Sequence, residues 1–151
     1  MATTFNLFDQ YRNFLANPAR AVAVSGTLKM ALFKSFAPDQ NLDDFYNDLV
    51  AGTNEVVGTG YAAGGATCAS PTWTGPDGAG LLTADAGDPA LWIQSPTGFT
   101  NARRAIVYYD TTVASTSRLV AFSNDFGADL GNVSGDVQVS FNPAGIYTAA
   151  R

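Results

Sequence analysis

The chain has 151 residues, of which 46% are hydrophobic and only 14% charged, and its formal net charge is −5 at pH 7. It contains no histidine and a single cysteine, Cys68, which excludes histidine-dependent catalysis, an intrachain disulfide and a thiolate zinc cluster. Eight basic residues against thirteen acidic ones are too few for a nucleic-acid-binding surface, and no apolar run approaches the ~18 residues of a membrane span.

The N-terminal segment has the spacing of an amphipathic helix. Phe5, Phe8 and Leu15 fall on the same side of a helix over residues 5–16, and Pro18 would stop that helix. Such a helix would dock on a neighbouring sheet or grip another subunit. The first residues contain no charged region followed by an apolar one, so we expect synthesis in a cytoplasm.

From residue 21 onward the pattern favours strands separated by turn residues. Apolar and β-branched runs predict strands over residues 21–24, 27–33, 55–57, 72–73, 81–83, 91–94, 105–109, 119–122, 137–141 and 146–148. A short helix is predicted over Leu42–Leu49, because its apolar side chains fall on one side and its aspartates on the other. Proline and glycine at positions 76 and 78 predict a β-turn, and polar connections are predicted at 111–117 and 127–135.

Many short strands joined by glycine- and proline-rich turns are typical of an all-β domain. We therefore expect one mainly β domain, a β-sandwich or jelly-roll-like fold, with an N-terminal helix and one short additional helix. Residues 1–20 would form the N-terminal helix or arm, and residues 21–151 the β-rich domain.

A glycine-rich segment, NEVVGTGYAAGG, occupies residues 54–65. Its spacing misses the dinucleotide-binding fingerprint, and no Gly-Lys-Ser/Thr follows, so a phosphate-binding loop is not indicated. The pattern favours a structural loop or bulge whose glycines need positive φ, and we expect no cofactor. The residues of this structural loop are Glu55, Gly58, Gly60, Tyr61, Gly64 and Gly65.

The remaining candidates for chemistry are weak. Residues 125–127 read Asp-Phe-Gly, but no other kinase element is present. Oxygen ligands at 125, 129, 132 and 136 do not match the EF-hand intervals, which favours solvated turn side chains over a calcium site. Glu55 is the only glutamate, so a pair of glycosidase carboxylates is not indicated, and we expect neither catalysis nor a metal. Arg103 and Arg104 would form salt bridges to a partner or protect an edge strand.

The order of the sequence segments resembles small virion proteins encoded in the head modules of tailed bacteriophages. NEVVGTGYAAGG at 54–65 is the most specific of these segments, and the resemblance covers nearly the whole chain. The other segments that carry it are LKMALF (28–33), FAPDQNLDDFYNDL (36–49), ARRAIVYYDT (102–111), RLVAFSNDFGAD (118–129) and GDVQVSFNPAGIYT (135–148).

Proteins of this kind look like capsid decoration, or cement, proteins, which sit on the outside of an icosahedral shell and often form trimers. The resemblance implies a structural virion protein, made in the host bacterial cytoplasm, that stabilises the capsid by bridging major capsid subunits. Low charge and abundant aromatic residues suit such a role, because Lys and Glu are depleted at protein interfaces. Expected contacts with the capsid or between copies are Phe5, Phe8, Leu15, Arg103 and Arg104.

Two other classes stay open at this point. A head-completion or tail-terminator ring protein would occur in few copies per particle. A tail or fibre module could bind host glycan if Trp73 and Trp92 were exposed, with Asp77 and Asp88 as hydrogen-bonding partners.

Overall fold

A computed structural model of the chain describes residues 2–3, 6–7, 27–38, 46–50, 54–74, 81–112 and 118–150. Within these ranges the protein is mainly β and carries one short helix, α2 (Tyr46–Val50). Its two longest strands are β7 (Ala102–Thr112) and β8 (Arg118–Leu130). The other strands are β1 (Ala2–Thr3), β2 (Asn6–Leu7), β3 (Leu28–Phe33), β4 (Ala66–Cys68), β5 (Thr72–Thr74), β6 (Leu81–Asp85), β9 (Ser140–Phe141) and β10 (Tyr147–Ala150).

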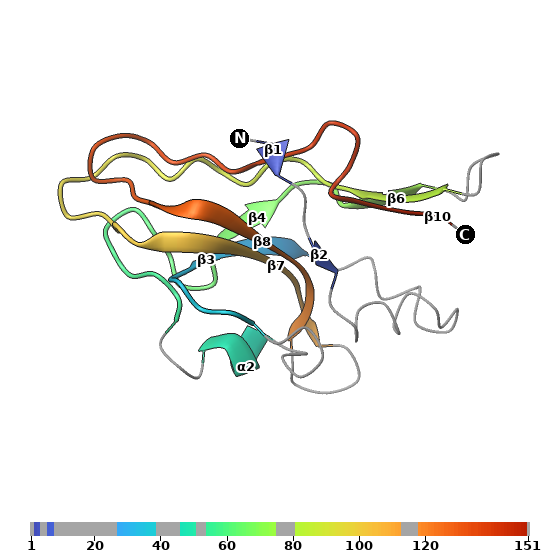
Figure 1. Ribbon diagram of the computed structural model, residues 1–151, viewed down its shortest axis with the longest axis horizontal. Helices are drawn as coiled ribbons and strands as arrows, with labels where there is room; N and C mark the ends of the chain where they lie inside the picture. Colours follow the sequence, from blue (N-terminus) through green and yellow to red (C-terminus); the bar gives the residue numbers. More distant parts are fainter. Residues whose placement is uncertain are drawn as a thin grey trace.

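Five strands form an antiparallel sheet in the order β2-β8-β7-β3-β4, with β7 in the middle (Figure 1). Four consecutive residues of β7, Ile106 to Tyr109, are all buried. Because successive side chains of a strand point to opposite faces, this strand must be covered on both sides. The centre of this sheet therefore lies in the interior of the fold.

Different segments cover the two faces of the sheet (Figure 1). On one face Tyr46 of α2 stacks on Tyr108 of β7, with ring centroids 4.4 Å apart. On the other face, segments 88–94 and 136–141 run side by side, and Trp92 and Val137 exchange two backbone hydrogen bonds. The buried side chains of these paired segments are Trp92, Val137, Val139 and Phe141.

Two smaller sheets complete the described part of the chain. A three-stranded antiparallel sheet has the order β10-β6-β5, and β1 pairs in parallel with β9. In the residues that the structure describes, no helix is both long and apolar enough to cross a membrane.

Most of the predicted strands are confirmed. The predictions at 27–33, 72–73, 81–83, 105–109, 119–122 and 146–148 each fall on a strand, with differences at the ends. Residues 137–141 alternate as predicted, with Val137, Val139 and Phe141 buried. The predicted strands at 55–57 and 91–94 form only single bridges, Phe33 to Glu55 and Trp92 to Val137.

The predicted loops at 111–117 and 127–135 are partly wrong. Thr112 pairs with Arg118, and Leu130 pairs with Ala102, so both long strands extend into those segments. The ladder shifts register between its pairings at Ala102 and Arg104, which leaves residues 126–129 of β8 opposite a single residue of β7. This bulge places Gly127 within a strand, whereas the sequence pattern alone predicts a loop at this position.

The predicted N-terminal helix is wrong where the structure describes it. Asn6 and Leu7 form an extended strand that pairs with Ser123 and Phe122 of β8. The edge of the long β8 supplies hydrogen-bond partners that outweigh the helical spacing of the segment. The anchor side chains Phe5, Phe8 and Leu15 lie outside the described residues, as do the predicted strand at 21–24 and turn at 76–78.

The second predicted helix, Leu42–Leu49, is confirmed from Tyr46 onward. Its first four residues lie outside the described ranges. Tyr46 and Leu49 are buried whereas Asn47 and Asp48 are exposed, as the amphipathic pattern predicts.

Candidate interaction surface

The carboxylate of Glu55 organises the glycine-rich loop. One of its oxygens accepts a hydrogen bond from Tyr46 Oη at 2.6 Å. The other accepts from Tyr61 Oη at 2.6 Å and from the backbone N–H of Gly64 at 2.7 Å. Because hydrogen bonds to a charged acceptor are strong, this half-buried carboxylate fixes the loop to α2.

Tyr61 connects this loop to both layers of the fold. Its hydroxyl accepts a hydrogen bond from Leu32 N–H at 3.0 Å, and its ring packs on Trp92 and Phe99. Burial, together with the hydrogen bond to Glu55, raises the pKa of Tyr61 well above its usual value. The side chain therefore stays neutral and acts as a hydrogen-bond donor to Glu55 at every physiological pH.

The predicted structural loop is confirmed, and its glycines have two distinct roles. Gly60, Gly64 and Gly65 have positive φ, as expected. Gly58 is needed for close packing instead, because a Cβ there would lie 2.4 Å from the backbone nitrogen of Phe99. Gly58 and Gly65 allow the loop to lie directly against neighbouring backbone.

Asn132 ties three loops together from a fully buried position. Its Oδ1 accepts from Phe99 N–H at 2.8 Å. Its Nδ2 donates to the carbonyl oxygens of Thr59 at 3.1 Å and Ile93 at 2.8 Å. A buried amide with both donors and its acceptor engaged rigidifies the backbone around it.

The loops held by Asn132 present apolar side chains to solvent. Val57 is 83% exposed and Ile93 is 67% exposed, while Leu91 is 42% exposed. A shallow hollow with a volume of about 530 Å³ lies beside Val57. Its lining residues are Val56, Val57, Gly58, Thr59, Tyr61, Ala63 and Thr97. Segments 56–65 and 89–99, which carry these exposed residues and the lining of the hollow, contain no charged side chain.

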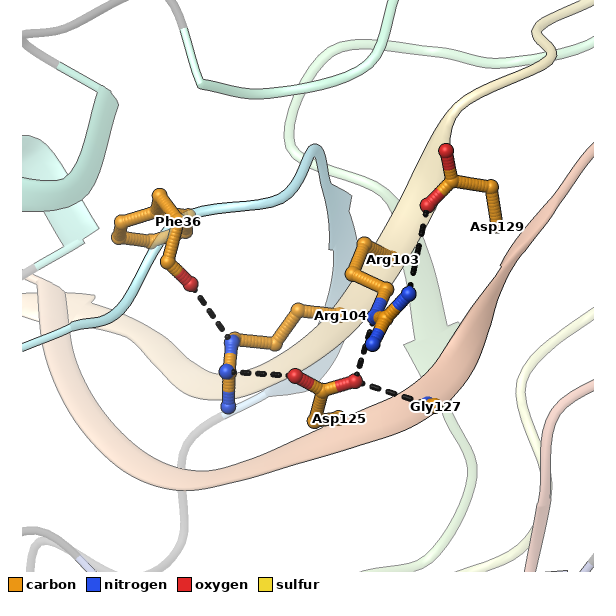
Figure 2. Close-up of polar contacts among 6 residues, drawn as sticks. All are labelled: Phe36, Arg103, Arg104, Asp125, Gly127 and Asp129. Carbon is orange, nitrogen blue, oxygen red and sulfur yellow. Dashed lines mark hydrogen bonds and ion pairs between the residues drawn. The ribbon is translucent and has the colours of Figure 1, made fainter.

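Arg103 and Arg104 converge on Asp125 of the neighbouring strand (Figure 2). Arg103 Nε and Arg104 Nη2 lie 2.7 and 2.9 Å from different oxygens of this carboxylate. Gly127 N–H donates to the same carboxylate at 2.8 Å, Arg103 also lies 3.9 Å from Asp129, and Arg104 Nε donates to the carbonyl of Phe36. The cluster thus pins the β8 bulge to β7 through charge-assisted hydrogen bonds.

Several expectations about these residues are corrected. Arg103 and Arg104 do not protect an edge, because β7 pairs on both sides in the middle of the sheet. Trp92 is buried at 4% exposure, since its ring fills the space beside Tyr61, and a sugar cannot stack on it. Asn132 is a buried structural amide rather than a solvated turn residue.

The oxygen-bearing side chains at 125, 129, 132 and 136 make separate contacts within the fold. In the described part of the chain, no group of three or more acidic or cysteine side chains is placed to hold a metal ion. Asp125 is engaged by the arginines, and Asp136 accepts a hydrogen bond from Gln94 N–H at 2.7 Å. These carboxylates hold loops and strands together.

Cys68 is buried at 1% exposure, as a small apolar side chain would be. Burial, with a further contribution from the negative charge of Asp88, raises the pKa of its thiol to about 12. The thiolate that reacts with electrophiles is therefore scarce at neutral pH, and this cysteine has the character of a core residue.

Replacing Asp125 with asparagine is expected to lower the free energy of unfolding at pH 7. The hydrogen bond from Gly127 N–H and the two arginines hold the pKa of Asp125 below its usual value. A carboxyl whose pKa is lower in the folded state stabilises the fold above its unfolded pKa of about 4 and loses that contribution as the pH falls below it. The measurement is chemical denaturation of both proteins at pH 7 and at pH 3.

Asp129→Asn is the matched control, because Asp129 contributes only one ion pair, at 3.9 Å, to the same cluster. We expect a smaller effect at pH 7 from Asp129→Asn, and a gap between wild type and Asp125→Asn that narrows at pH 3. A gap for Asp125→Asn that stays constant across this range would contradict the role given to the carboxylate charge.

Comparison of the chain with protein-family models, curated proteins and solved structures finds no match. The surface described above therefore carries the functional argument, together with the sequence segments themselves. Sequence reasoning missed Val57 and Ile93 as exposed residues and Asn132 as the residue that joins their loops. The alternation of Leu91, Trp92 and Ile93 was the available signal, because it places the tryptophan on the opposite side from its neighbours.

Proposed function

We propose that this protein is a structural virion protein that binds the outside of an icosahedral phage capsid and stabilises it by bridging major capsid subunits. The observation that carries the proposal is a fixed, uncharged loop surface on which Val57 and Ile93 are exposed. Exposed aliphatic side chains on a rigid, charge-free surface favour contact with another protein. The bacteriophage context comes from the sequence segments described above.

The way in which the loops are held supports an adhesive role. A surface that is already ordered loses little conformational entropy on binding, so more of the contact energy is kept as affinity. Asn132 and Glu55 supply this order through six hydrogen bonds to the loops and the tyrosines around them. In a catalytic site, polar side chains would point toward a bound substrate. The polar groups of Glu55 and Asn132 instead form hydrogen bonds with other groups of the chain.

Stabilisation of the capsid would follow from mass action alone. A protein that binds only the expanded shell stabilises that state by an amount that grows with its free concentration above the dissociation constant. Contacts from several linked copies would multiply the effect through a high effective concentration.

We also propose that the fold is a β-sandwich in its finer description. The five-stranded sheet would be one layer, and the paired segments 88–94 and 136–141, with β9, would be the other. Trp92, Val137 and Phe141 are buried in the same hydrophobic cluster as Ile106 and Val107 of the sheet, and the segments that carry them run along one face of the sheet (Figure 1), which supports this arrangement.

Binding to shells tests the proposal. The purified full-length protein is mixed with expanded and with unexpanded shells of the major capsid protein from the phage that encodes it, and bound protein is measured after sedimentation. We expect saturable binding to expanded shells and a higher temperature of shell disruption. Equal sedimentation with both shells and with an unrelated acidic protein, or no binding at all, would contradict the proposal.

The glycan-binding alternative loses one of its two tryptophans, because the ring of Trp92 is inside the fold. A ring protein at the portal or tail would also use protein contacts, and it differs from a decoration protein in its copy number per particle.

A further inference from the structure

Segment 136–141 uses only one of its edges to pair with segment 88–94. Val137 exchanges two backbone hydrogen bonds with Trp92 across that edge. Because successive peptide groups of an extended chain point to opposite edges, that of Gln138 points to the other edge. The residues on either side of Val137 therefore have their N–H and C=O groups on a second edge.

The N-terminal strand β1 occupies part of this second edge. It pairs in parallel with β9 at Ser140 and Phe141. Phe141 N–H donates to Asp88 on the first edge, so β1 adds to the second. Because β1 is parallel to β9, residues 136–139 lie beyond its first residue, Ala2, and none of the described strands pairs with them there. An open strand edge is a template for further extended backbone, here in line with β1.

A hollow lies along this open edge, between residues 136–139 and the end of β8. Its volume is about 310 Å³, at the lower limit of pockets that bind small molecules, so it fits one long side chain better than a cofactor. Its walls are mostly apolar, since Phe126, Val137 and Val139 are buried and Leu130 is half-buried. Asp136 and Gln138 supply its polar part.

The polar part of the hollow offers hydrogen-bond acceptors and negative charge. Asp136 Oδ1 accepts from Gln94 N–H at 2.7 Å, which fixes the carboxylate without neutralising it. Gln138 Nε2 donates to the carbonyl of Pro89 at 3.1 Å, a bond that does not use its amide oxygen. In the described part of the chain no basic side chain forms an ion pair with Asp136, and residues 128–139 contain no basic residue. The charge that complements this hollow is therefore positive.

We propose that this groove binds an extended segment of a partner protein that carries an arginine side chain. The segment pairs its backbone with the open edge at Gln138 and continues the line of β1. The aliphatic part of the arginine packs on Phe126 and Val139, and its guanidinium binds the carboxylate of Asp136. These residues are separate from the loop surface that carries Val57 and Ile93, so the inference goes beyond the proposed function and does not depend on it.

Arginine fits this groove better than lysine, because the groove offers two separate acceptors. Side chains two residues apart in an extended chain lie on the same side, which brings the Asp136 carboxylate and the Gln138 amide oxygen to one side of the segment. A guanidinium carries several N–H donors in one plane and is less strongly hydrated than an ammonium group. The net charge of −5 also attracts a basic segment from a distance.

NMR titration of the isotope-labelled full-length protein tests this inference. The probe is a short acetylated and amidated peptide with arginine at its centre and alternating valine and threonine around it. We expect saturable shifts of the backbone amides of residues 126–130 and 136–139. The same peptide with citrulline, which has the shape of arginine without its charge, is expected to bind at least ~10-fold more weakly.

Asp136→Asn is expected to weaken binding of the arginine peptide by a similar factor, because asparagine still accepts from Gln94 N–H but carries no charge. Asp48→Asn is the matched control. It removes one charge at an exposed position of α2 and is expected to leave the dissociation constant unchanged. Thermal unfolding checks the fold of both variants, and the citrulline comparison on the wild-type protein requires no variant.

Shifts at the groove that need both the guanidinium and Asp136 support the inference. It is overturned by the absence of saturable binding, by shifts confined to other residues, or by equal binding of the arginine and citrulline peptides. Unchanged binding to Asp136→Asn also overturns it. An equal loss in Asp48→Asn has the same consequence, because attraction by the overall charge would then account for the binding.

Discussion

Replacing Gly65 with alanine is expected to lower the free energy of unfolding by about 4 kcal/mol or more, which is enough to unfold many domains of this size. A Cβ at Gly65 would lie 1.8 Å from the carbonyl oxygen of Met30 and 2.6 Å from Ala31 Cα, both in the backbone of β3. The residue also has φ of 75°, where side chains are strained. Neither the buried strand nor the loop can move away without breaking the pairing of β3.

Urea denaturation followed by tryptophan fluorescence measures this effect, and Gly135→Ala is the matched control. A Cβ at Gly135 meets nothing within 4 Å, and its φ lies outside the positive region, so the substitution is expected to change stability by less than ~1 kcal/mol. Similar denaturation midpoints for Gly65→Ala and wild type would mean that the loop does not pack on β3 as described.

Replacing Asn132 with aspartate is expected to destabilise the protein by about 3–5 kcal/mol, a comparable loss from a different cause. The new carboxylate cannot donate to Thr59 and Ile93, and it brings an oxygen to within hydrogen-bonding distance of both carbonyl oxygens. Asn132 is fully buried, so water does not replace the lost donors. Asn132→Ala keeps the site neutral but also leaves Phe99 N–H without its acceptor.

The same denaturation experiment applies, with Asn142→Ala as the control. Asn142 is exposed, and its side chain accepts a local hydrogen bond from Ala144 N–H, so its loss is expected to cost about 1 kcal/mol or less. We further expect hydrogen exchange in Asn132→Asp to accelerate first at the backbone of residues 58–60 and 93–99. Uniform acceleration across the whole chain, or none, would contradict the role of this amide as a local tie.

The centre of the sheet follows from local sequence. Residues 105–109 are apolar and rich in β-branched and aromatic side chains, and they form a strand buried on both faces. Residues 28–33 form the neighbouring strand, and Lys29, at its one charged position, makes an ion pair with Asp110 at 2.6 Å. In such segments the propensity of each residue agrees with the final structure, which is why the pattern predicts them.

The parts that were mispredicted depend on distant partners. Residues 127–130 continue β8 because Leu130 pairs with Ala102. The bulge lies between this pair and the pair of Arg104 with Asp125, and it allows Gly127 to adopt positive φ inside a strand. Asn6 and Leu7 are extended because the edge of β8 is available to pair with them. Local spacing contains no information about either partner, so helix and loop were the natural expectations.

The sequence likewise predicts some features of the candidate interaction surface and not others. Positive φ at Gly60, Gly64 and Gly65 was predicted, because clustered glycines mark such backbone. The hydrogen bonds of Asn132 span 33 to 73 residues of sequence, and an asparagine next to a glycine looks like an ordinary turn residue. The exposure of Val57 could not be predicted from the sequence either, because Val57 follows the buried Val56 and differs from it only in the direction of its side chain.

The number of copies per virion tests the central claim most directly. Purified particles of the bacteriophage that we propose encodes this chain are analysed by quantitative mass spectrometry, with the major capsid protein as the internal reference. A capsid decoration protein is expected in hundreds of copies, in a simple ratio to the major capsid protein. Absence from the particles, or only the six or twelve copies of a ring at the portal or tail, would contradict it.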